Sequence, residues 1–212
     1  MKNYGKLAIG LIAVWFIFAL SASALHVFEN GANRIGLGVA IGALTPIVVF
    51  FLWLAASESF RRFAFSLNPR ILTSAQAWRI VGFTFVLLEA RGALPAIFAL
   101  PAGYGDMAIG ATASFVACKL ASSAHRNSFV LWQLLGITDL VIAVSLGTTA
   151  GLISPQGPSM APMTTMPLSL IPTFLVPLFV IFHVICIGQA RSWKAVSESA
   201  PQTMRPAQHP AV

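Results

Sequence analysis

Apolar stretches about 20 residues long occupy most of this 212-residue chain. A helix needs about 20 apolar residues to cross a bilayer, and only helices and closed barrels satisfy all their backbone hydrogen bonds in lipid. The composition agrees, because 57% of the residues are hydrophobic and 9% are charged, against about a quarter charged in soluble domains. The sequence therefore predicts an all-α polytopic membrane bundle. Six spans are expected, at residues 7–25, 36–56, 80–100, 107–123, 129–151 and 168–188.

One transmembrane domain accounts for nearly the whole chain. It is expected to cover residues 1–190, because the longest gap between predicted spans, residues 57–79, is too short for a soluble domain. The polar residues 191–212 are expected to form a disordered cytoplasmic tail.

The net charge of +7 follows the predicted topology. Eleven of the thirteen Lys and Arg residues lie toward one side of the predicted membrane, in the terminal segments, in the gap that holds Arg61, Arg62, Arg70 and Arg79, or around the end of the fourth span. This bias predicts cytoplasmic N- and C-termini. It argues against a nucleic-acid partner, and it suggests that Arg61 and Arg62 contact anionic lipids.

The first apolar stretch has a second interpretation. A basic start and Ala22-Ser23-Ala24 are typical of a cleaved signal peptide. The stretch is long for a signal, and its retention gives an even number of spans, so we expect it to be retained. Cleavage would leave five spans.

Charged residues inside predicted spans mark a polar centre. Glu89 and Arg91 lie in the third predicted span, Asp139 in the fifth, and Asp106 at the start of the fourth. Such residues are costly in a bilayer and suggest a functional site. Two positions on a helix differ by about 200°, so Arg91 is expected to pair with Asp139 or Asp106 rather than with Glu89. The alternative is an ion pair that only fixes the helix register.

Prolines add candidates to this centre. A helical proline leaves the carbonyl four residues before it without its hydrogen bond. Pro95 would therefore free the carbonyl of Arg91, and Pro177 would free the carbonyl of Thr173. Freed carbonyls at membrane depth are tolerated where they are buried or line a cavity. Thr173, and Tyr104 close to Asp106, are therefore further candidates for lining a solute or ion pathway.

The segment Gly103-Tyr104-Gly105-Asp106 resembles the Gly-x-Gly-Asp motif of intramembrane aspartyl proteases. That resemblance implies a second aspartate that shares a proton with the first, and Asp139 would have to serve. In those proteases the other aspartate precedes the motif, whereas Asp139 follows it. The resemblance covers four residues.

Three methionines, Met160, Met163 and Met166, are spaced three apart in an outward loop. Soft thioether sulfur selects Cu(I), and the spacing resembles the methionine motifs of copper-handling proteins. The alternative is a set of apolar contacts with the membrane surface.

Across Trp78-Arg79, Leu94-Pro95 and Pro101 to Asp106, the chain resembles uncharacterised bacterial multi-pass membrane proteins. This resemblance implies a bacterial inner-membrane location and no particular activity. We expect the protein to bind or pass a small solute or ion and not to be an enzyme. An aspartyl-type hydrolase using Asp106 and Asp139, and a non-catalytic assembly subunit, are the alternatives.

Overall fold

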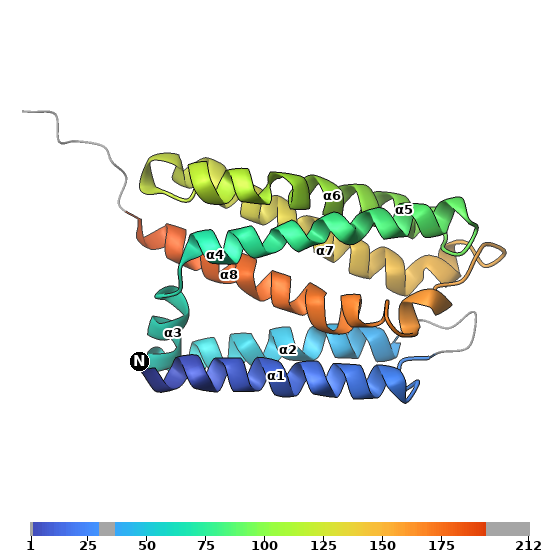
Figure 1. The fold of residues 1–212 in the computed structure, drawn as a ribbon, viewed down its shortest axis with the longest axis horizontal. Helices are drawn as coiled ribbons and strands as arrows, with labels where there is room; N and C mark the ends of the chain where they lie inside the picture. The colour runs from blue at the N-terminus through green and yellow to red at the C-terminus, as the bar shows by residue number, and fades with distance from the viewer. Residues whose placement is uncertain (1, 30–36, 194–212) are drawn as a thin grey trace, which may run out of the picture.

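The computed structural model describes residues 2–29 and 37–193, and every regular element within these ranges is helical. The long helices lie side by side and alternate in direction, so that both ends of the described chain lie at the same end of the bundle (Figure 1). The predicted tail falls almost entirely within residues 194–212, which lie outside the described residues.

Five segments are long and apolar enough to cross a membrane, which agrees with the prediction of a helical membrane protein. They are Tyr4–Ala24, Leu37–Ala56, Pro69–Ala90, Ser123–Ile153 and Ile171–Ser192. The first two contain α1 (Lys2–Ala24) and α2 (Leu37–Ala56). The third joins α4 (Pro69–Ala75), the 3₁₀ helix η1 (Gln76–Gly82) and α5 (Phe83–Ala90). The last two contain η2 (Ser123–His125) with α7 (Arg126–Ile153), and the π-helical turn η4 (Ile171–Leu175) with α8 (Val176–Ser192).

A further long helix, α6 (Ala96–Lys119), is not among these five segments. Its 24 residues would extend about 36 Å at 1.5 Å per residue, more than the hydrocarbon thickness of about 30 Å. It packs along η1, α5 and α7. Asp106 lies in the middle of this helix and lowers its hydropathy.

The third and fourth predicted spans have the wrong bounds. The third helical segment begins at Pro69 because Asn68 caps it by accepting a hydrogen bond from the Arg70 amide at 2.9 Å. It ends at Ala90, and Pro95 is the N-cap of α6. The prediction that Pro95 frees a carbonyl inside a span is therefore wrong. The predicted spans 80–100 and 107–123 correspond to helices at 69–90 and 96–119.

Part of the predicted cytoplasmic gap is a short helix, α3 (Glu58–Phe65), which lies across the end of the bundle (Figure 1). Ser57 caps α3 by accepting a hydrogen bond from the Phe60 amide at 3.2 Å. The Phe60 ring stacks on Trp53 with ring centroids 3.9 Å apart. This aromatic face therefore packs against the protein, and Arg61 and Arg62 lie on the same short helix.

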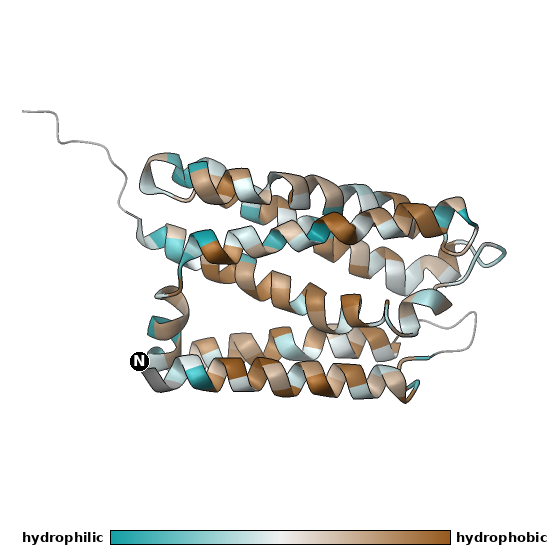
Figure 2. Cartoon of the chain, in the orientation of Figure 1, coloured by the Kyte–Doolittle hydropathy of each residue, from teal (hydrophilic) through white to brown (hydrophobic). Residues whose placement is uncertain are grey.

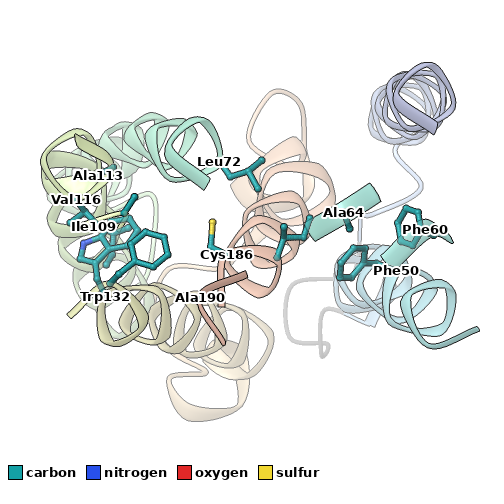
Figure 3. Packing of buried hydrophobic residues seen from close by; sticks show 13 residues of the cluster. Phe50, Phe60, Ala64, Leu72, Ile109, Ala113, Val116, Trp132, Cys186 and Ala190 are labelled. Atoms are coloured by element: carbon teal, nitrogen blue, oxygen red, sulfur yellow. The ribbon is translucent and has the colours of Figure 1, made fainter. Parts of the chain in front are cut away.

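Helix α8 lies at the centre of the packing. Figure 3 shows Cys186 between residues of the α4–α7 side, such as Leu72 and Trp132, and Phe50 and Phe60 on the other side. These side chains belong to one buried hydrophobic cluster. Helix α8 thereby joins the bundle of α4 to α7 to α2 and α3.

Helix α1 lies at the edge of the molecule. Its main contacts are with η4 and α3, through Trp15 with Phe174 and Tyr4 with Phe63. Hydrophobic colour covers much of α1 and α2, whereas α4–α5 carries hydrophilic patches (Figure 2). The strongly polar part of the protein is thus in the other half of the bundle.

Candidate functional site

A single guanidinium, that of Arg79, holds the polar centre together. Arg79 is 2% exposed. Its Nε donates a hydrogen bond to Oδ1 of Asp106 at 2.7 Å, and its Nη2 donates to Oδ2 of Asp139. Its Nη1 donates to the carbonyl of Gly136 at 3.2 Å and lies 3.3 Å from Nε2 of His183. Side chains or backbone of η1, α6, α7 and α8 therefore meet at one guanidinium.

The helical geometry of η1 places Arg79 in the interior. A 3₁₀ helix has three residues per turn, so side chains three positions apart share a face. Gln76, Arg79 and Gly82 are all buried, and the buried Thr73 precedes them at the same interval on α4. This period-three stripe faces α6, α7 and α8 and carries the polar groups that meet there.

A chain of oriented hydrogen bonds continues from Arg79. Because the guanidinium can only donate, Nε2 of His183 accepts and the ring proton lies on Nδ1, 2.5 Å from Oε1 of Gln133. Nε2 of Gln133 then donates to Oγ1 of Thr73 at 3.1 Å, and the Thr73 hydroxyl lies 3.7 Å from Sγ of Cys186. His183 is thus a buried histidine with both ring nitrogens hydrogen-bonded.

Glycines let the helices approach closely enough to bury this network. A Cβ atom at Gly105 on α6 would overlap the carboxylate of Asp139, and a Cβ atom at Gly136 on α7 would overlap the ring of His183. Both positions must therefore be glycine for the observed packing. The second glycine of the Gly-x-Gly-Asp segment has this packing function.

The structure separates Glu89 and Arg91 from the polar centre. Glu89 is in the last turn of α5, and the exposed Arg91 begins the turn that leads to α6. The prediction that Arg91 pairs with Asp139 or Asp106 is wrong, because both carboxylates bind Arg79. Neither Glu89 nor Arg91 belongs to an ion pair among the residues that the structure describes.

Tyr104 and Thr173 also lie apart from the charges. The Tyr104 side chain is exposed on α6. Thr173 is buried in η4, where its carbonyl accepts a hydrogen bond from Nε1 of Trp15 at 3.2 Å. The carbonyl that Pro177 was predicted to free therefore has a partner on α1.

A cavity of about 90 Å³ is lined by Asp106 and by residues of the loop between α7 and α8. Its walls are mostly apolar and include Phe98 of α6, Thr148 of α7 and Met163 of the loop. A single water needs about 10–15 Å³, so the cavity has room for several waters or a small solute. No hydrogen bond to Oδ2 of Asp106 occurs among the described residues. The site therefore offers an acceptor oxygen to a ligand.

The three methionines are only partly brought together. Met160 and Met163 line the cavity, and Met163 packs in a buried apolar cluster with Phe85 and Phe98. Met166 is 48% exposed and is not among the residues that line it. Two thioethers can face one ligand here, and the copper site of three methionines stays a prediction.

The carboxylates do not form the arrangement that an aspartyl hydrolase needs. Asp106 and Asp139 each bind Arg79, and no hydrogen bond joins the two carboxylates in the described part of the chain. A catalytic dyad shares one proton between adjacent carboxyl groups, whereas here each carboxylate accepts a hydrogen bond from the same guanidinium. The geometry does not support the hydrolase hypothesis.

Residues 33–191 match a protein family described as "Domain of unknown function (DUF8737)". The chain belongs to this family. No curated protein and no solved structure matches it. The part that matches the DUF8737 family contains Arg79, Asp106, Asp139 and His183, and α1 precedes it.

Three members of the polar centre, Arg79, Gln133 and Gln76, are not predicted from the sequence. Arg79 was assigned to a cytoplasmic gap on the evidence of the charge bias. The signal that could have found it is the interval of three between Thr73, Gln76 and Arg79, which continues through Gly82.

Proposed function

We propose that this membrane protein binds a small cation, or a small solute with a cationic group, at Asp106. The observation that supports this best is that the cavity is lined by Asp106, whose Oδ2 has no protein partner among the described residues. A carboxylate at the end of an apolar cavity attracts a positive charge more strongly than it would in water, because the local dielectric is low.

The charges around the cavity favour a cation. Two carboxylates face one guanidinium, and His183 is uncharged when its Nε2 accepts from Arg79. With both carboxylates ionised, the cluster carries one excess negative charge. A bound cation at Asp106 balances this charge, whereas an anion would add to it.

We further propose that the chain has six spans with both termini in the cytoplasm of a bacterial cell, and that it lies in the inner membrane. The charge bias supports this orientation, as does the position of both ends of the described chain at one end of the bundle. In this orientation the cavity opens toward the outside. If the protein is a transporter, the cation bound at Asp106 passes across the membrane.

Cation-dependent unfolding tests the binding site. Purified protein in detergent is heated with increasing sodium, potassium or methylammonium chloride, with choline chloride keeping the ionic strength constant. A ligand that binds only the folded state raises the unfolding temperature as its concentration exceeds Kd. We expect a rise for at least one small cation and its loss in Asp106→Asn. Glu58→Gln, which removes an exposed carboxylate outside the cavity, should keep the rise.

A second variant separates loss of the ligand from loss of the fold. Ala143 lines the cavity but makes no polar contact with the charged cluster, so Ala143→Phe should fill the space and abolish the cation effect with Asp106 intact. Equal stabilisation by all the salts, or a cation effect that survives in both variants, would contradict the proposal. Flux of the stabilising cation into proteoliposomes then tests passage.

A further inference from the structure

A long apolar groove lies between α1, α2, α3 and α8. Its volume is about 630 Å³, within the range of about 300–1,000 Å³ typical of small-molecule sites. It extends from Phe28, next to the outward loop, to Phe63 on α3, so it is as long as the helices that line it.

The groove offers almost nothing to a polar ligand. Nε1 of Trp15 already donates to the carbonyl of Thr173, and the hydroxyl of Thr45 donates to the carbonyl of Ile41 at 2.7 Å. The hydroxyl of Thr173 donates to the carbonyl of Ser169 at 2.7 Å. Apart from the indole of Trp53, the other lining side chains are apolar. Water would find few partners here, and an empty space of this size would deprive its walls of dispersion contacts. Hydrocarbon is the matching occupant.

The end of the groove at α3 has the opposite character. Phe60, Phe63 and Ala64 of α3 line the groove, whereas Arg62 on the same helix is exposed. The guanidinium of Arg62 lies 3.9 Å from Glu58, and both side chains are about 70% exposed. A charge this accessible can bind a phosphate.

We propose that the groove binds one acyl chain of an anionic glycerophospholipid from the surrounding membrane, with the phosphate next to Arg62. Helix α1 closes one side of the groove and packs mainly through η4 and α3. The acyl chain therefore supplies packing between α1 and α8 that the side chains leave incomplete. This site is separate from the cation site at Asp106.

Lipid retention tests this proposal. The full chain is reconstituted in nanodiscs of equal parts phosphatidylglycerol and phosphatidylcholine, extracted with mild detergent, and examined by native mass spectrometry. We expect one retained phospholipid, mostly phosphatidylglycerol. Ile12→Trp fills the groove from α1 and should reduce retention at least fivefold. Ile9→Trp is the matched control, because Ile9 is 71% exposed on α1 and does not line the groove.

Two further variants keep the test decisive. Val49→Trp fills the groove from α2 and should reproduce the loss if Ile12→Trp does not fold. Arg62→Gln should retain lipid but lose the preference for phosphatidylglycerol, whereas Arg191→Gln, an exposed arginine on α8, should keep it. Retention unchanged in both tryptophan variants, or an unchanged headgroup preference in Arg62→Gln, would overturn the proposal.

Discussion

Arg79 shows how a buried charge determines which residues around it can change. Two carboxylates, a backbone carbonyl and an imidazole surround its guanidinium. Breaking a buried ion pair by removing one partner is more harmful than removing both, because the remaining charge has no compensation. Arg79 is therefore the position in the polar centre where a substitution should have the largest effect.

Arg79→Leu should lower the free energy of unfolding by about 3–5 kcal/mol, the usual cost of stranding a buried charge. Combining it with Asp106→Asn and Asp139→Asn should recover much of this loss, because no net charge then remains in the cluster. Arg91→Leu is the matched control, and its effect should stay within about 0.5 kcal/mol as for other surface positions. Denaturant unfolding in detergent measures all three proteins. A larger loss for Arg91→Leu than for Arg79→Leu would refute this account of the ion pairs.

A second prediction concerns the contact between Gly136 and His183. A methyl group at Gly136 would overlap the imidazole ring, so Gly136→Ala should destabilise the protein by about 1–3 kcal/mol, as overpacking does elsewhere. Gly10→Ala on α1 is the control, since a Cβ atom there has no neighbour within 4 Å. Thermal unfolding of both variants provides the comparison. If Gly136→Ala is as stable as Gly10→Ala, the close approach of α7 and α8 is not as described.

At the scale of single elements, the sequence predicts the apolar helices well and the polar ones poorly. The predicted spans 36–56 and 129–151 lie close to α2 and α7, because uninterrupted apolar stretches leave little choice. The segment 69–90 was predicted less well because it contains Arg79. Hydropathy counts that residue as an isolated charge, whereas its compensating carboxylates lie on α6 and α7, far away in the sequence.

For the same reason, the sequence predicts the two carboxylates of the candidate site but not its arginine. Asp106 and Asp139 could be recognised because an acid within an apolar helix needs a partner. An α-helical period of 3.6 does not favour Arg79 over Arg91, because Thr73, Gln76 and Arg79 align on one face only with the period of three of a 3₁₀ helix. Local geometry that depends on tertiary packing was the missing information.

The turn between α5 and α6 leads to a prediction that separates the observed helices from the predicted span 80–100. Arg91 is exposed in this turn, so Arg91→Cys, in a variant with Cys118 and Cys186 replaced by Ala, should react with a membrane-impermeant maleimide. Leu87→Cys should not react, because position 87 lies within the apolar helix α5 and is expected to face lipid. Labelling of intact cells measures both. If neither position 91 nor position 87 reacts with the maleimide, the result would favour the predicted span 80–100 over the observed turn.

For the whole molecule, the number of spans depends on whether α6 crosses the membrane. It is not among the five segments that are apolar enough, but its central charge is paired with Arg79. Pairing with Arg79 reduces the free-energy cost of placing Asp106 in the bilayer. A hydropathy value summed residue by residue does not include this pairing. In the bundle α6 also packs along its neighbours α5 and α7. We therefore expect it to span the membrane with them.

Reporter fusions distinguish six spans from five because each span reverses the side of everything that follows it. With six spans, fusions after Ser66 and Ser122 should report the cytoplasm, and fusions after Gly92 and Gly157 should report the outside. If α6 does not cross, the fusion after Ser122 reports the outside and the one after Gly157 the cytoplasm, while the fusions after Ser66 and Gly92 report the same sides as with six spans. The basic residues near Ser122, Lys119 and Arg126, favour the cytoplasm at that point. A cytoplasmic signal after Gly157 would also place the opening of the cavity at Asp106 on the inner side, and the cation would then enter from the cytoplasm.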